Sequence, residues 1–168
     1  GLAHSTHPKG EHSKGSLIHD HVHGLLIVGN LYAHNYERNP MFKADVRGQI
    51  INNLIYNPGQ RAVHYNLIAE EWVGHAYAPS EMVMIGNVLQ GGPSTVPGLP
   101  MLMLGGSADL ILYQRDNIAV DRFGAALPLT GRYTTARAQF RAMQAPTLAL
   151  GVKPLAALEV QDAVIAAA

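Results

Sequence analysis

The chain lacks cysteine, which excludes a disulfide framework but does not indicate a cellular compartment. It has no excess charge of either sign, because 12 basic residues balance 12 acidic ones. Proteins that bind nucleic acid or anionic membranes usually carry a basic face, and this composition indicates none. The sequence also lacks an apolar run near the ~18 residues that span a bilayer. We therefore expect neither a nucleic-acid partner nor a membrane partner.

Aromatic residues are also scarce, at 7% of the 168 residues, whereas glycine is frequent, with 17 residues. Such a composition favours many turns over a bundle of long helices. The length is enough for one domain with a continuous core, or for part of a larger domain. The composition thus indicates a turn-rich fold without choosing one.

An internal repeat indicates which turn-rich fold the chain adopts. Four short runs of β-forming residues, at 25–30, 49–53, 82–87 and 111–117, each end in an asparagine that an apolar residue follows. The four asparagines, at positions 30, 53, 87 and 117, are separated by 23, 34 and 30 residues. One coil of a parallel β-helix needs roughly 20 residues, and a longer interval is a coil with a loop on one face. The repeat predicts an all-β solenoid, a parallel β-helix.

Asparagine has a physical reason to recur at such positions. At a sharp bend between strands it satisfies backbone groups and tolerates left-handed dihedral angles. Stacked on the asparagine of the next coil, it can form a ladder of amides. An antiparallel sandwich with asparagine-rich turns is the alternative. The Asn-Gly pairs typical of hairpins are absent between the runs, which favours stacked coils.

The repeat is no longer visible after Gly124, which predicts two parts. Residues 1–124 would form the coils of the β-helix. Residues 125–168 would form a C-terminal strap and a short helix that pack on the coils. The helix is expected within 155–168, because this alanine-rich segment follows Pro154 and carries apolar residues at helical spacing.

Four polar motifs occur in a fixed order among the first coils. Residues 14–18 read Lys-Gly-Ser-Leu-Ile, 29–30 read Gly-Asn, 38–43 read Arg-Asn-Pro-Met-Phe-Lys and 52–53 read Asn-Asn. In this order they resemble the family 1 pectate lyases, closely over about residues 12–57 and more weakly to about Gly124. An Arg-x-Pro motif alone is common, but its place between two such strands is fairly specific. The resemblance implies a right-handed parallel β-helix and a secreted, extracellular or periplasmic enzyme.

The resemblance also implies roles for three residues. Arg38 would be the base that removes the C5 proton of a galacturonate in the β-elimination of polygalacturonate, an acidic polysaccharide. Lys14 and Lys43 would bind substrate carboxylates, and calcium would assist them, because the enolate-like charge that develops needs fixed cations. The family more often has arginine at position 43, so Lys43 keeps the charge but loses the bidentate fork.

Several alternatives stay open. Arginine is charged in water, so Arg38 could act as a base only if calcium and neighbouring cations disfavour its charged form. Arg38 would otherwise be a solvated surface residue, or one paired with a neighbour such as Glu37. A different class of function is a non-catalytic carbohydrate-binding or structural β-helix fragment that has lost its calcium ligands. A β-helix glycoside hydrolase is a third interpretation, but no pair of acidic residues near Arg38 supports it.

The histidine-rich segment 19–23 suggests a metal. On a strand, His19, His21 and His23 would point to one face, and three imidazoles can bind zinc. No His-Glu-x-x-His spacing supports a known metalloenzyme site, so exposed histidines are the alternative.

Calcium ligands are not evident, because the acidic residues are scattered and form no ligand loop. In the resembled family the principal calcium carboxylates precede the position of Lys14, where this chain has Glu11 alone. We therefore expect the principal calcium ligands outside this chain, and both ends to be truncated. A second chain or a missing segment would then complete the β-helix.

Overall fold

The computed structural model describes residues 6–8, 10, 12–146 and 148–168, which are mostly β-structure. Sheet I contains β1 (Leu17–Ile18), β4 (Met41–Phe42), β7 (Val63–Leu67), β10 (Leu102–Gly106) and β13 (Thr130–Arg132). Sheet II contains β2 (His23–Val28), β5 (Arg47–Ile51), β8 (Ser80–Ile85), β11 (Leu110–Arg115) and β14 (Phe140–Ala142). Sheet III contains β3 (Leu31–Ala33), β6 (Leu54–Tyr56), β9 (Val88–Gln90) and β12 (Ile118–Val120). A 3-10 helix, η1 (Ala69–Trp72), and an α-helix, α1 (Ala157–Ala167), complete the described elements.

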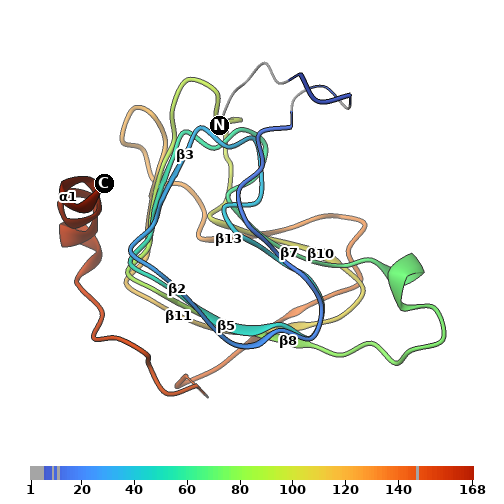
Figure 1. The fold of residues 1–168 in the computed structure, drawn as a ribbon. Helices are drawn as coiled ribbons and strands as arrows, with labels where there is room; N and C mark the ends of the chain where they lie inside the picture. The colour runs from blue at the N-terminus through green and yellow to red at the C-terminus, as the bar shows by residue number, and fades with distance from the viewer. Residues whose placement is uncertain (1–5, 9, 11, 147) are drawn as a thin grey trace.

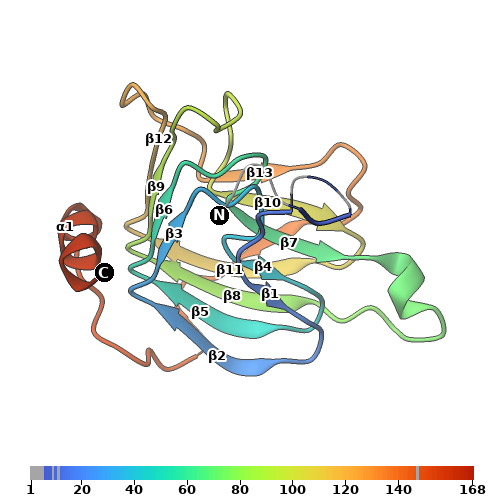
Figure 2. The same ribbon diagram turned by 45° about the horizontal axis from the view of Figure 1, so that its top comes forward.

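The chain passes through the three sheets in turn, so that neighbours within a sheet are three strands apart in sequence. Every pairing between named strands is parallel, as between β2 and β5 or β7 and β10. Viewed along the stack, strands from successive turns lie one behind another (Figure 1), and after rotation they lie side by side (Figure 2). The predicted all-β fold with parallel strands is confirmed at this level, and the arrangement is compatible with a solenoid.

The asparagine repeat marks the bend between sheets II and III. The side-chain amide of Asn30 donates to Asn53, that of Asn53 to Asn87 and that of Asn87 to Asn117, each at 3.0 Å. The predicted ladder of amides is therefore present. The left-handed backbone falls one residue earlier than expected, on the residue that precedes each asparagine. These residues are Gly29, Asn52, Gly86 and Asp116, with φ between 52° and 66° at the bend.

The core lies between the three sheets. Side chains that alternate along the strands point inward and meet there, including Phe42 of sheet I, Ile50 of sheet II and Ile55 of sheet III, none of which is exposed. The alternate residues of each strand therefore point outward. The parallel pairing of the strands also determines which outward-pointing residues of sheet I are neighbours.

The sheets continue beyond Gly124, where the sequence predicted their end. β13 pairs with β10, and β14 pairs with β11. Thr-Gly-Arg in β13 has no run of β-forming side chains, so this strand was not predicted from its residues. The chain then crosses the outside of sheet II, where the Gln49 side chain donates to the carbonyl of Ala149 and accepts from the Gly151 amide.

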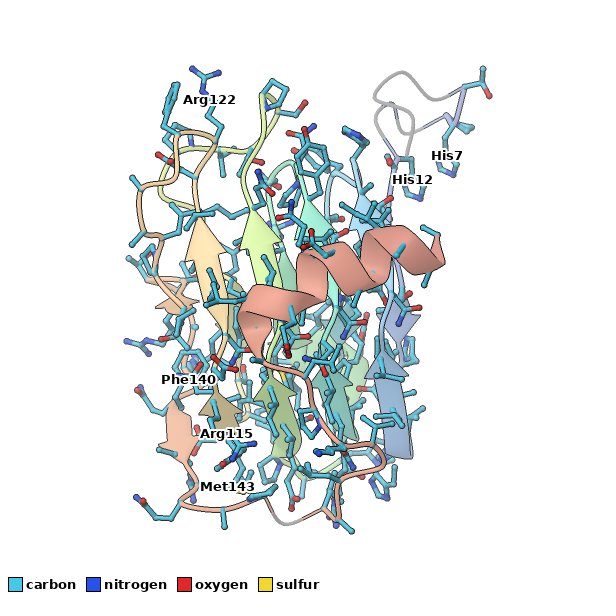
Figure 3. The ribbon with its side chains drawn as sticks, turned by 90° about the vertical axis from the view of Figure 1, so that its left-hand side faces the viewer. His7, His12, Arg115, Arg122, Phe140 and Met143 are labelled. Atoms are coloured by element: carbon cyan, nitrogen blue, oxygen red, sulfur yellow. The ribbon has the colours of Figure 1, made fainter. Side chains whose placement is uncertain are left out.

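The predicted C-terminal helix is confirmed as α1, which lies across sheet III (Figure 3). Its residues Ala157, Val160 and Val164 pack on Leu54 and Val88. The helix α1 thus lies against sheet III, and the segment before it lies against part of sheet II.

Candidate functional site

The motif that begins at Lys14 lies against the motif that begins at Arg38. The Gly15 amide donates to the Glu37 carbonyl at 3.0 Å, and the Ser16 amide donates to the Arg38 carbonyl at 2.8 Å. A Cβ atom on Gly15 would lie 2.2 Å from that Arg38 oxygen, so only glycine permits this approach. The two motifs that carried the family resemblance are therefore in contact at the start of β1 and β4.

Arg38 has an unusual backbone and an unusual side chain. Its φ is 66°, in the left-handed region that a residue with a Cβ rarely adopts. Its Nε is buried and, among the described residues, has no hydrogen-bond partner. Glu37 pairs instead with Lys14, at 2.7 Å, and with Arg61. The alternative in which Glu37 neutralises Arg38 is therefore wrong.

Glu37 lies between two cations. Burial raises the pKa of its carboxyl group, but the hydrogen bonds and charges of Lys14 and Arg61 outweigh burial and hold the pKa below its ordinary value. Glu37 thus stays ionised. It fixes the positions of Lys14 and Arg61 beside Arg38.

Lys43 lies at the end of β4 and is only 4% exposed. Its ammonium group donates to the carboxylate of Glu71, which lies on η1 in the segment between β7 and β8. Lys14 and Lys43, the two residues expected to bind substrate, are thus both paired with a carboxylate of the chain itself. A substrate carboxylate would have to replace Glu37 or Glu71 as their partner.

His64 is the residue that sequence reasoning missed. It lies on β7 opposite Met41 of β4, is 5% exposed, and neither of its ring nitrogens has a hydrogen-bond partner in the described part of the chain. Its pKa is lowered to about 4, chiefly by burial and also by the charges of Arg61, Arg38 and Lys43, against the opposing effect of Glu37. The imidazole is therefore neutral at physiological pH and lies close enough to all these charges to respond to them.

A cavity of about 510 Å³ extends from His64 across the outer face of sheet I. Arg61, Tyr133 and Arg137 line it, and Arg61 donates to the Tyr133 hydroxyl. The ring of Tyr133 stands edge-on to His64, with 5.9 Å between ring centroids. A polar cavity with several cations and a neutral imidazole suits an anionic, hydroxyl-rich ligand.

The residues around Arg38 do not fit calcium. Calcium takes six to eight oxygen ligands, usually with several carboxylates. The nearby carboxylate of Glu37 is bound by Lys14 and Arg61, and that of Glu71 is bound by Lys43.

The three histidines of segment 19–23 do not form one site. β2 begins only at His23, and His21 has a left-handed φ of 64°, so the segment is not a strand. His21 and His23 both contact Asp45, at 2.9 and 3.2 Å, whereas His19 contacts Asp20 at 2.7 Å. The three imidazoles therefore do not converge on one metal site, which agrees with the interpretation of these residues as separate histidines.

Comparison with family models, with curated proteins and with solved structures found no match. The longest helix in the described ranges, α1, has 11 residues, and no helix there has the length and apolar character needed to cross a membrane.

Proposed function

We propose that the chain forms a right-handed parallel β-helix whose sheet I carries the active site of a pectate-lyase-type polysaccharide lyase. Its substrate would be polygalacturonate or a related uronate polymer outside the cell or in the periplasm. The observation that carries the proposal is the buried, unpartnered Nε of Arg38 amid Lys14, Lys43 and the neutral His64. A structural arginine is normally hydrogen-bonded, so a buried guanidinium nitrogen without a partner favours a ligand-binding role.

The reaction would be a β-elimination. Arg38 takes the C5 proton, the electrons of the C5–H bond form a C4=C5 double bond, and the C4–O bond to the neighbouring sugar breaks. The leaving oxygen takes a proton and becomes the new chain end. Negative charge builds on the C6 carboxylate as the proton leaves, and fixed cations lower the energy of that state.

Lys14 and Lys43 would supply those cations by exchanging partners. Both are already held by carboxylates, at Glu37 and Glu71, so their positions do not depend on substrate. A uronate carboxylate matches the chemistry of the group that it replaces. The neutral imidazole of His64 adds a hydrogen-bonding group without adding charge, which suits a sugar hydroxyl.

The test is incubation of the chain with polygalacturonate. A lyase produces unsaturated ends that absorb ultraviolet light, a hydrolase produces reducing ends alone, and a binding module produces neither. We expect Arg38→Ala to reduce elimination at least about 100-fold, as loss of a proton-transfer group does. Arg115→Ala, which removes an exposed arginine from sheet II, is the matched control and should keep full activity.

If Arg38→Ala kept the full rate of β-elimination, Arg38 would not be the base. If the products had reducing ends but no ultraviolet absorption, the chain would be a hydrolase and not a lyase. The family resemblance also implies calcium as a cofactor. Parallel reactions with added calcium and with a chelator test that part separately.

A further inference from the structure

A second polar cluster lies apart from Arg38, where two distant segments of the chain meet. His19, Asp20 and Glu71 each offer one ligand atom, and these atoms all lie within 4.8 Å of one another. His19 and Asp20 follow β1, whereas Glu71 belongs to η1 in the loop between β7 and β8, which projects from the body in Figure 1. The fold thus assembles a nitrogen ligand and two carboxylates that the sequence places about fifty positions apart.

Asp20 is held in one orientation. Its Oδ1 accepts hydrogen bonds from the Ala44 amide at 2.9 Å and from the Trp72 indole at 3.2 Å, while its Oδ2 faces the His19 ring at 2.7 Å. Trp72 is buried, so it ties the loop to the turn that carries Asp20. Partners of this kind orient ligands in metal sites and strengthen binding.

The cluster opens into a separate cavity of about 510 Å³. The ligand candidates line it together with His75, a second imidazole from the same loop. The cavity has room for an ion with bound water, and its lining includes more ligand atoms than the three that already converge.

We propose that His19, Asp20 and Glu71 bind a divalent transition-metal ion of the zinc class, with His75 as a candidate fourth ligand. One or two imidazole nitrogens with two carboxylates are typical zinc ligands, whereas calcium prefers oxygen alone. The site does not depend on the lyase proposal, because none of these ligands has a chemical role in the elimination, although Glu71 also pairs with Lys43. The proposed site contains one histidine of the 19–23 segment, His19, and its other two converging ligands are carboxylates.

Lys43 gives the proposal a specific signature, because its ammonium group already binds Glu71. A metal ion and the ammonium group compete for the same carboxylate. Loss of the lysine charge in Lys43→Met should therefore tighten metal binding severalfold. Adventitious binding to exposed histidines would not change, since Lys43 contacts no histidine of this segment in the described ion pairs.

Titration calorimetry with zinc chloride on the full 168-residue chain tests the site. We expect one saturable site, weakened at least about tenfold by His19→Ala and by Glu71→Gln. His23→Ala is the matched control, because His23 is exposed and contacts Asp45 instead, and it should bind zinc as the parent does. Metal-free melting curves of the variants confirm that each is folded.

Cobalt provides a second measurement, because four- or five-coordinate cobalt in a protein site absorbs visible light more strongly, and at longer wavelength, than the six-coordinate aqueous ion. This stronger absorption should be lost in His19→Ala and kept in His23→Ala. Absence of saturable zinc binding would overturn the proposal. So would equal weakening by His19→Ala and His23→Ala, or unchanged affinity in Lys43→Met. Lyase activity is not part of this test, so either proposal can fail without the other.

Discussion

Arg38 carries two unfavourable features at once, a left-handed backbone and a buried Nε without a partner. Each costs stability, the first by about 1–2 kcal/mol and the second by about 1–3 kcal/mol. Glycine at position 38 would avoid both costs. The presence of arginine there is therefore better explained by what it does to a ligand than by what it does for the fold.

The two costs can be separated by substitution. Arg38→Gly should be more stable than Arg38→Ala by about 1 kcal/mol, because glycine adopts a positive φ without strain. Both variants should lack lyase activity. Urea unfolding measures the stability difference, and the polygalacturonate assay measures activity. Equal stability of the two variants would contradict the strained backbone at this position.

His64 predicts a pH dependence of stability. Its pKa in the folded state is about 4, against an ordinary value of 6.5. Between pH 6.5 and pH 4, His64 is therefore protonated in the unfolded chain but neutral in the folded chain. The free energy of unfolding should fall as the pH drops through this window, by up to about 3 kcal/mol.

His64→Gln should abolish that loss between pH 6.5 and 4. Further loss below pH 4 should remain in the variant, because the pKa of Glu37 is also lowered and its contribution is lost only when Glu37 itself is protonated. Urea midpoints at a series of pH values provide the comparison. An unchanged slope in His64→Gln would show that another group titrates in this window.

Sequence reasoning reached Lys14, Arg38 and Lys43 through motifs, but it missed Arg61 and His64. The signal for His64 was the alternation of Val63, His64 and Tyr65, which places His64 on the outer face. That alternation indicates on which face of the sheet His64 lies, but not which residues of other strands lie beside it. Proximity of β7 to β4 depends on the pairing of successive turns, which no local pattern specifies.

At the scale of elements, the sequence revealed sheet II and the start of sheet III, because each turn repeats the same strand and asparagine there. Sheet I was not visible, since loops of unequal length precede its strands and β1 and β4 have only two residues each. η1 was also unpredicted. The elements that carry the candidate site are therefore those that vary most from turn to turn.

The amide ladder predicts a gradient of stability between the rungs. Asn53 is fully buried, donates to Asn87 and to the carbonyls of Ile27 and Ile51, and accepts from Asn30. Asn53→Ala leaves several of these groups unsatisfied and should cost about 3 kcal/mol.

Asn30 is the matched control, because it lies in the first turn and its side chain is exposed. Asn30→Ala should cost less than about 1 kcal/mol. The comparison needs only urea unfolding of the two variants. Equal destabilisation would mean that the ladder contributes no more in the interior of the stack than at its end.

For the whole molecule, the first turn is one of the two ends of the stack of described strands. β1, β2 and β3 each have a partner strand on one side only among the described strands. Their large apolar residues are also exposed, at 40% for Leu17, 38% for Leu26 and 43% for Leu31. Unpaired strand edges with apolar side chains attract further strands.

We therefore expect the 168-residue chain to self-associate through this turn. Sedimentation velocity at increasing concentration should show dimers or larger species, and Leu26→Lys should shift the population toward monomer. Leu158→Lys is the control, because Leu158 is 85% exposed but lies on α1 and not on a strand. It should leave association unchanged. A monomer at all concentrations would rule out this interface.

The bend before each ladder asparagine affects how a molecule of this kind can lengthen in evolution. Each turn that carries a ladder asparagine has its own bend, its own rung and its own layer of core, so it is a module that resembles its neighbours. Duplication of one turn would create new interfaces of the same kind and would leave the existing ones intact. Each added module would widen the outer face of sheet I by one strand spacing, about 4.8 Å. If the proposed polysaccharide substrate binds there, the length of polymer that the molecule contacts is a quantity that gene duplication can adjust in equal steps, with the surroundings of Arg38 unchanged.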